Sequence, residues 1–147
     1  MSEIESATLC DLPALMDVEL ASHYHPWKLS IMERYVRSGA VLVLRDQGQL
    51  SGFAIVTVVA GEGELLNIAV APAARGQGHA QKLLLAVDQK ALDQKAERVF
   101  LEVRESNQVA IGLYEQHGYC QAGVRPRYYP TANGREDAWL YCQELMV

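Results

Sequence analysis

The sequence predicts an α/β fold, in which helices flank a mixed and mostly antiparallel β-sheet. The chain has 147 residues, the size of one compact domain, and we therefore expect a single domain over residues 1–147. Half of the residues are hydrophobic, which is enough for one core. The hydrophobic patterns follow the order helices, three antiparallel strands, helix, strand, helix and two strands. This order predicts an α/β sandwich around a mixed sheet.

Residues 11–37 have a helical pattern, which begins with a capping aspartate and a first-turn proline in Asp11-Leu12-Pro13. The segment SHYHPW interrupts the pattern, because proline disfavours helix at the residue before it. Two helices with a bend between them are therefore expected. The segments AVLVLRD and SGFAIVTVVA follow, separated by Gln47, Gly48 and Gln49, and predict a β-hairpin.

The next two elements are a strand and a long helix. The segment ELLNIAVA is the third expected strand, with Leu66, Ile68 and Val70 on one face. Residues 78–96 are expected to form an amphipathic helix. The apolar side of that helix contains Ala80, Leu83, Leu84, Val87 and Ala91.

The last third of the chain predicts a strand, a short helix and two final strands. In RVFLEVR the valines and Leu101 point inward, so Glu102 points to the other face. The helix NQVAIGLYEQHG is capped by Ser106 or Asn107 and closed by Gly118 in a left-handed turn. Two strands, YCQAGV and DAWLYCQEL, follow, and the long turn RPRYYPTANGRE joins them.

Composition and charge narrow the class of protein. A formal net charge of −5 argues against direct nucleic-acid binding and suits an enzyme acting on a small molecule or a cationic macromolecule. The first residues are not typical of a signal peptide, and no apolar run reaches the ~18 residues of a membrane span. The three cysteines are scattered and predict reduced thiols in a cytoplasmic protein, without metal-ligand spacing.

The segment RGQGHA, residues 75–80, connects the third strand to the long helix. A glycine-rich turn at this place presents free backbone N–H groups and the positive end of the helix dipole. The P-loop pattern is missing, and the dinucleotide pattern GxGxxG fails because Gln81 occupies the third glycine position. These residues alone leave two interpretations open, a tight connection and a phosphate cradle.

The spacing Arg75-x-x-Gly78-x-Ala80 after a strand resembles the [QR]-x-x-G-x-[GA] signature of the GNAT family of N-acetyltransferases. Six further segments are similar to the members of that family that acetylate the N-terminal alanine of a small-subunit ribosomal protein. They are DLPALMDVE, His23-x-x-Pro26-Trp27, LNIAV, LEVRESN, GLYEQHGY and RYYPTANGREDA. The resemblance implies the GNAT fold, acetyl-coenzyme A (acetyl-CoA) as co-substrate and a protein N-terminus as acceptor. No metal is expected, because the histidines and cysteines form no cluster of ligands.

In the family, the backbone of the third strand binds the pantetheine arm of acetyl-CoA, and the loop amides bind its pyrophosphate. The resemblance assigns cofactor binding to Ile68, Ala69, Val70, Arg75, Gly76, Gln77, Gly78, His79, Ala80, Gln81, Asn107 and Tyr114. The amide of Val70, or one beside it, would face the thioester carbonyl. The loop departs from the family pattern, which often has two or three arginines, because Gln77 leaves Arg75 alone. Gly112 also replaces the usual alanine in the short helix.

The resemblance makes Glu102 the general base, acting through water, and Tyr114 the acid that protonates the departing thiolate. It places Trp27, Asn67, Tyr128 and Tyr129 at the peptide substrate. Taken without the resemblance, Glu102 equally fits a salt-bridged surface residue, Tyr114 a core aromatic and Asn107 a helix cap. Two other functions stay open: acetylation of a small molecule or lysine, and a non-catalytic acyl-CoA-binding module.

Overall fold

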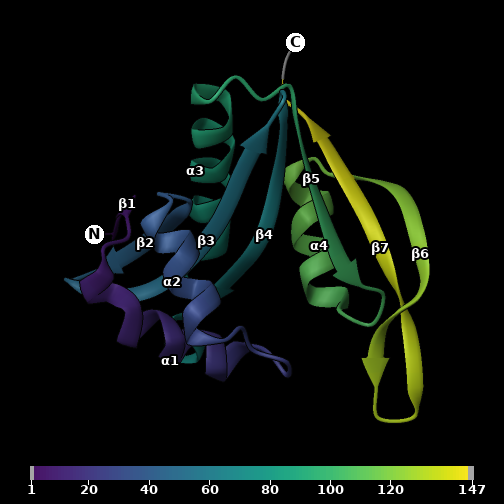
Figure 1. Ribbon diagram of the computed structural model, residues 1–147, viewed down its shortest axis with the longest axis horizontal. Coiled ribbons are helices and arrows are strands. Elements are labelled where there is room, and N and C mark those ends of the chain that lie inside the picture. Colours follow the sequence, from purple (N-terminus) through teal and green to yellow (C-terminus); the bar gives the residue numbers. More distant parts are fainter. Residues whose placement is uncertain (1, 146–147) are drawn as a thin grey trace. The chain divides into compact units, whose positions relative to one another are not determined.

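The computed structural model describes residues 2–145. In this part of the chain seven strands are hydrogen-bonded in the order β1-β2-β3-β4-β5-β7-β6 (Figure 1). The order mixes antiparallel pairs with a parallel β4–β5 pair, which confirms the predicted α/β fold with a mixed sheet. The chain divides into two compact units. The first contains residues up to 57 together with 65–90, and the second contains 58–64 together with 91 onward.

The first unit contains three strands and three helices almost completely. They are β1 (Ser2–Ser6), β2 (Val41–Asp46), most of β3 (Gln49–Val59), α1 (Leu12–Ser22), α2 (Leu29–Arg37) and most of α3 (His79–Asp93), with two short 3-10 helices (Leu9–Asp11 and Pro72–Ala74). It also holds residues 65–70 of β4 (Glu62–Val70). The two predicted helices with a bend are therefore confirmed, since α1 ends where His23 becomes extended.

Successive side chains of β2 and β3 point to opposite faces of the sheet, and because consecutive apolar residues are buried here, both faces are apolar. One face packs with Leu15 of α1 and Met32 of α2 through Val43 and Phe53, all fully buried. The other face turns toward α3, because a Cβ placed on Gly52 of β3 would meet the Leu83 side chain at 3.2 Å. Figure 1 shows α1 and α2 together on one side of β2 and β3. Of the predicted apolar side of α3, Leu83, Leu84, Val87 and Ala91 are fully buried and Ala80 is half-buried.

The second unit contains residues 62–64 of β4, β5 (Arg98–Arg104), α4 (Gln108–His117), β6 (Cys120–Thr131) and β7 (Gly134–Glu144). Val99, Leu101 and Val103 of β5 are buried, as predicted. Asn107 caps α4, since its Oδ1 accepts the Ala110 N–H at 3.2 Å, and Gly118 ends the helix in the left-handed region at φ 119°. Both ends of the predicted short helix are thus confirmed.

Three sequence predictions need correction. The strand β1 was not predicted, because SEIES is a short edge strand with charged residues. The predicted long turn over residues 125–136 is wrong: β6 and β7 continue through it and turn only at residues 132–133. The prolines of β6 are compatible with pairing, since β6 is an edge strand. The helix α3 ends at Asp93 rather than at residue 96, and Lys95 takes a left-handed φ of 69°.

Candidate active site

The glycine-rich loop lies in the first unit between β4 and α3. Gly76 and Gly78 adopt φ values of 78° and 80°, and a Cβ placed on either would meet no atom within 4 Å. The backbone is therefore left-handed and open on its outer side at both positions. The Gly78 carbonyl accepts the Lys82 N–H, so α3 begins here, and the N–H groups of its first turn have no acceptor within the helix.

Arg75 does not extend away from the protein. Its Nε donates to the carbonyl of Val70 at 3.1 Å, and its Nη2 lies 3.4 Å from Oγ of Ser22 in α1. The guanidinium therefore connects the end of β4 to the end of α1. Both of these hydrogen bonds are solvent-exposed, so the charge of Arg75 is still available to an anion at the loop.

His79, the first residue of α3, points its side chain into the protein. The side chain is 4% exposed, and Nε2 lies 3.5 Å from Oδ2 of Asp46. The ring is thus directed at β2, and the backbone N–H is the group that His79 presents at the start of the helix. Ala80 is half-buried, while Gly76, Gln77 and Gln81 are exposed.

A buried carboxylate, Glu19, occupies the last turns of α1. Its side chain is 1% exposed and accepts three hydrogen bonds: from His23 Nδ1 at 2.8 Å, from the Trp27 N–H at 2.9 Å and from Asn67 Nδ2 at 2.9 Å. Burial by itself raises the pKa of Glu19, but the hydrogen bonds from these three donors outweigh it, and the net pKa is lowered. The carboxylate therefore links α1 to the α1–α2 segment and to β4.

This contact fixes two of the predicted substrate residues. Asn67 directs its amide at Glu19, and Trp27 is half-buried against the core of the first unit, with its ring 5.3 Å from that of Tyr35. Sequence reasoning missed Glu19, because a glutamate in an amphipathic helix usually faces solvent. The available signal was its spacing of four residues from His23, which places both on one face of the helix.

In the second unit, Glu102 lies in the middle of β5, opposite Leu140 of β7. Its Oε1 is 3.3 Å from Nη2 of Arg125 in β6, and its side chain is 30% exposed. The carboxylate is therefore reachable by water and has a cationic partner. The salt-bridged arrangement that the sequence left open is present.

Tyr114 of α4 is buried, and its ring meets that of Tyr119 edge to face at 5.8 Å. Burial, and to a smaller extent the neighbouring Tyr129, raise the pKa of Tyr114 to about 12. The phenol thus stays protonated at every physiological pH. Tyr114 is both part of the core and a potential hydrogen-bond donor.

Tyr128 and Tyr129 form an edge-to-face pair with ring centroids 5.0 Å apart. The guanidinium of Arg104 lies 4.4 Å from the Tyr129 centroid, and that of Arg125 lies 5.3 Å from the Tyr128 centroid. Burial and then the negative charge of Glu102 raise the pKa of Tyr129. Arg125 therefore connects Glu102 to the Tyr128–Tyr129 pair, in the same unit as Tyr114.

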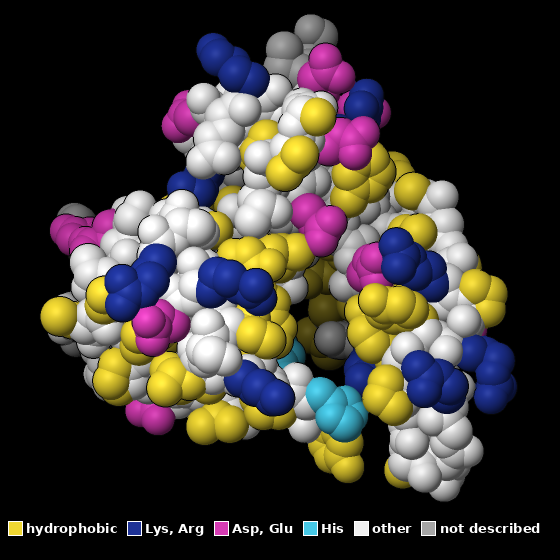
Figure 2. Space-filling view, in the orientation of Figure 1, with side chains coloured by type: hydrophobic (Ala, Val, Ile, Leu, Met, Phe, Trp, Pro, Cys, Tyr) yellow, Lys and Arg dark blue, Asp and Glu magenta, His cyan; other side chains and the backbone are white. Residues whose placement is uncertain are grey.

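Arginine side chains gather over β6 and β7 on the face shown in Figure 2, and these strands contain Arg125, Arg127 and Arg135. Their contacts differ. Arg125 pairs with Glu102, whereas Arg135 donates from Nε to the Arg127 carbonyl at 2.7 Å and from Nη2 to the Tyr128 carbonyl at 2.8 Å. Arg125 therefore forms an ion pair with the carboxylate of Glu102, whereas Arg135 donates to the backbone at and beside Tyr128.

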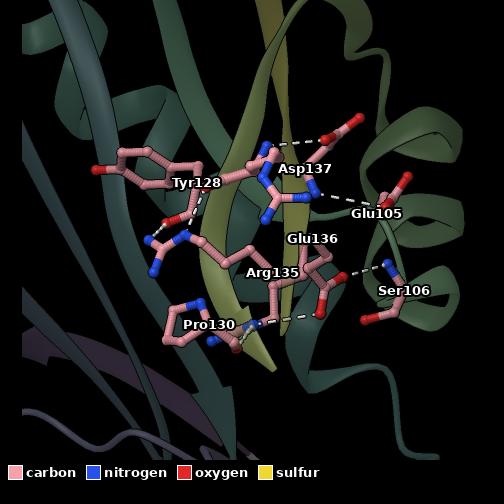
Figure 3. A network of polar contacts seen from close by, with 9 residues as sticks. Glu105, Ser106, Tyr128, Pro130, Arg135, Glu136 and Asp137 are labelled. Carbon is pink, nitrogen blue, oxygen red and sulfur yellow. Dashed lines mark hydrogen bonds and ion pairs between the residues drawn. The ribbon is translucent and has the colours of Figure 1, made fainter. Parts of the chain in front are cut away.

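The segment Arg135-Glu136-Asp137 of β7 fixes the backbone around these tyrosines (Figure 3). The pairing of β6 with β7 shifts between Arg125 and Tyr129, and Asp137 fills the gap by accepting the Arg127 N–H at 2.9 Å. Glu136 accepts the Ser106 N–H at 3.0 Å, and hydrogen bonding from Ser106 is the main cause that lowers the pKa of Glu136. Sequence reasoning gave these three residues no role, because it placed Arg135 and Glu136 in the long turn; the available signal was a run of three consecutive charges.

These features define a class of protein. In the first unit, a glycine-rich left-handed loop connects a strand to a helix N-terminus, an arrangement typical of anion-binding sites, and the second unit contains a carboxylate and a protonated phenol. The chain belongs to the acetyltransferase (GNAT) family, whose pattern matches residues 7–119.

Within that family the chain resembles one group of enzymes along nearly its whole length. It is 38% identical over 94% of both chains to [Ribosomal protein bS18]-alanine N-acetyltransferase of Escherichia coli K12. It is 35% identical to the Haemophilus influenzae protein of the same name, over 94% of this chain and 95% of that one. The crystal structure of the ribosomal-protein-S18-alanine N-acetyltransferase from Escherichia coli superimposes with a TM-score of 0.92 at 35% identity, covering 100% of this chain and 96% of the other.

Neither a metal cluster nor a membrane-spanning helix is present in the described part of the chain. No group of three or more His, Cys, Asp or Glu side chains in residues 2–145 could hold a metal ion. In the same residues, no helix is long and apolar enough to cross a membrane.

Proposed function

We propose that this protein transfers acetyl from acetyl-CoA to the N-terminal α-amine of a protein, and that the acceptor is the N-terminal alanine of a small-subunit ribosomal protein. The relatives named for this reaction align with this chain over nearly their whole length and nearly its whole length, which supports the choice of substrate. A ribosomal acceptor also implies a cytoplasmic enzyme. The observation that carries the chemistry is the partly exposed carboxylate of Glu102, 3.3 Å from the Arg125 guanidinium, in the same unit as the buried and protonated phenol of Tyr114.

The loop fits the phosphates of acetyl-CoA. Its two left-handed glycines leave the main chain open to a bulky anion, and the first N–H groups of α3 add the positive end of the helix dipole. We assign the pyrophosphate to the backbone of residues 76–81, and the pantetheine arm to the backbone of residues 68–70. The cap of α4 uses Oδ1 of Asn107, so its amide Nδ2 is the group that would donate to the coenzyme.

Glu102 takes the role of general base through a water molecule. An α-amine has a pKa near 8, so roughly a tenth is already neutral at pH 7, whereas a lysine near 10.4 is neutral to only about 0.04%. A partly exposed carboxylate relaying a proton through water therefore suits an α-amine better than a lysine. The tyrosine pair beside Glu102, with Tyr128 exposed and Tyr129 half-buried, provides an apolar surface for the first residues of the peptide.

Tyr114 serves the departing thiolate. A phenol with a pKa of about 12 is a much weaker acid than a thiol with a pKa of about 8.5, so complete proton transfer to the sulfur is unfavourable. The phenol instead donates a hydrogen bond to the sulfur as negative charge develops there. This modifies the role of proton donor that the resemblance implied, and it uses the same atom.

The acyl group passes directly from thioester to amine. A covalent enzyme intermediate needs an activated nucleophile, and burial raises the pKa of the Cys142 thiol, which works against its activation. We therefore expect initial-rate kinetics of a ternary complex, with intersecting rather than parallel double-reciprocal lines.

The test uses acetyl-CoA with a peptide that begins with alanine and contains one internal lysine, beside the same peptide with a blocked N-terminus. Release of free thiol only with the open N-terminus is the expected result. Equal release with the blocked peptide would show a lysine acetyltransferase. Tight binding of CoA without any release would favour a non-catalytic module.

A further inference from the structure

Two side chains connect the end of α1 to the same four residues of β4. Glu19 accepts the Asn67 amide at 2.9 Å. Arg75 donates to the Val70 carbonyl at 3.1 Å and reaches Ser22 of α1 at 3.4 Å. Both connections lie within the first unit and bracket residues 67–70.

The first connection is specific because Glu19 is almost completely buried. A buried carboxylate is costly unless its oxygens are hydrogen-bonded, and here each oxygen accepts at least one hydrogen bond. Its three donors come from the end of α1, from the following segment and from β4. The buried carboxylate of Glu19 cannot replace the Asn67 hydrogen bond with one from bulk water, so this bond fixes the position of Asn67 relative to α1.

The second connection fixes one peptide plane from both sides. Arg75 binds the Val70 carbonyl, and the N–H of Ala71 in the same peptide donates to the Ser51 carbonyl at 2.8 Å. In the first unit β4 is also hydrogen-bonded to its sheet neighbour β3, so the two side-chain connections add to backbone pairing along residues 67–70.

We propose that Glu19 and Arg75 form a clamp on residues 67–70 of β4, and that both are positioning residues for acetyl transfer. The proposal rests on the proposed function, which assigns the pantetheine arm to the backbone of residues 68–70. It gives Arg75 a role that differs from that of a phosphate ligand: Arg75 orients the strand that receives the donor. Glu19 holds the other end of the same segment through its hydrogen bond with Asn67.

A lysine distinguishes the two roles of Arg75. Arginine uses two separate donors to bridge the Val70 carbonyl and Ser22, which a single ammonium group does not reproduce. Lysine would still attract phosphate as a point charge. Arg75→Lys should therefore behave like Arg75→Ala if the clamp is correct, and like the wild type if Arg75 only binds phosphate.

The kinetic test compares two donors, acetyl-CoA and S-acetylpantetheine, which lacks the pyrophosphate. For Arg75→Lys and Arg75→Ala we expect kcat to fall by roughly tenfold or more, and by the same factor with both donors. A loss confined to acetyl-CoA, or a rise in its KM alone, would overturn the clamp and make Arg75 a phosphate ligand.

A second readout needs no reaction. Amide hydrogen exchange of the segment 67–71 should become faster in Glu19→Gln, Asn67→Ala and Arg75→Lys, measured without any donor. Glu33→Gln is the matched control, since Glu33 is also a helical glutamate of this unit but forms an exposed pair with Arg37, and exchange should be unchanged. Unchanged exchange in all three clamp variants would refute the clamp even if the enzyme is active. Faster exchange in an enzyme that acetylates no peptide would refute the proposed function and leave the clamp intact.

Discussion

The phenol of Tyr114 combines burial with a chemical role, and the two can be separated. Tyr114→Phe keeps the ring contact with Tyr119 and removes only the hydroxyl. We expect kcat to fall by about 10²-fold, because the hydrogen bond to the leaving sulfur is lost, while the Kd for CoA changes little. Stopped-flow turnover and calorimetric binding check the two quantities. Tyr24→Phe, at a residue that is 87% exposed, is the control, and an unchanged kcat in Tyr114→Phe would remove the residue from the reaction.

Glu102 and Tyr129 influence each other through their charges. Burial is the main cause that raises the pKa of Tyr129, and the carboxylate of Glu102 adds to it. Glu102→Gln should therefore lower the pKa of Tyr129 part of the way toward 10, besides reducing kcat. Titration of the Tyr129 ring by NMR measures the shift. Glu97→Gln, at an exposed residue, is the control, and a Tyr129 pKa that stays the same in Glu102→Gln would contradict the described neighbourhood.

Two glycines in regular elements have opposite consequences for stability. A Cβ added to Gly112 of α4 would meet no atom within 4 Å, so Gly112→Ala should raise the free energy of unfolding by about 1 kcal/mol. Gly52 of β3 is tight: its Cβ would lie 2.9 Å from the Ala69 carbonyl oxygen. Gly52→Ala should therefore lower the free energy of unfolding by roughly 1–3 kcal/mol. Urea unfolding of both variants tests the pair, and a destabilised Gly112→Ala would contradict the description of α4.

At the level of elements, local signals predicted most of the fold. The structure confirms the helix α3, predicted from the spacing of its apolar residues, and both ends of α4, predicted from the Asn107 cap and the Gly118 turn. Each of these signals lies within a few residues of the element that it predicts. The β6–β7 hairpin is longer than predicted, because the prediction placed one long turn over residues 125–136. Only Ala132 and Asn133 form the turn, and the rest is held by Arg135, Glu136 and Asp137.

The sequence predicted those residues of the candidate site that belong to a family motif. Glu102, Tyr114 and the loop residues follow from the resemblance to the family, whereas the partners of these residues do not. Glu19, Arg125 and the Val70 carbonyl acquire their roles from contacts between segments distant in sequence, such as Glu19 with Asn67. No local pattern reports such a contact.

For the molecule as a whole, buried tyrosines predict how stability depends on alkaline pH. The pKa of Tyr114 is about 12, mainly through burial, and that of Tyr141 is about 12 through burial and a hydrogen bond to Glu115. An unfolded tyrosine titrates near 10. Below about pH 10 both states hold these protons, so the stabilisation is complete. Between about pH 10 and 12 the unfolded chain loses them first, and stability falls as pH rises.

Urea unfolding at about pH 8, 10 and 11 measures this dependence. Replacing both Tyr114 and Tyr141 with phenylalanine should flatten the decrease above about pH 10, while a Tyr24→Phe control should retain it. An equally steep decrease in the double variant would assign the alkaline transition to other groups.

The acceptor preference is a property of the whole enzyme, and one peptide tests it. A peptide with a free N-terminal alanine and an internal lysine offers two amines to the same enzyme and the same acetyl-CoA. Tandem mass spectrometry of the product after a single limiting addition of donor locates the acetyl group. We predict that it lies on the α-amine of alanine, with the lysine unmodified. Acetyl on the lysine side chain, with the alanine amine free, would contradict the assignment of this chain as a protein N-terminal acetyltransferase.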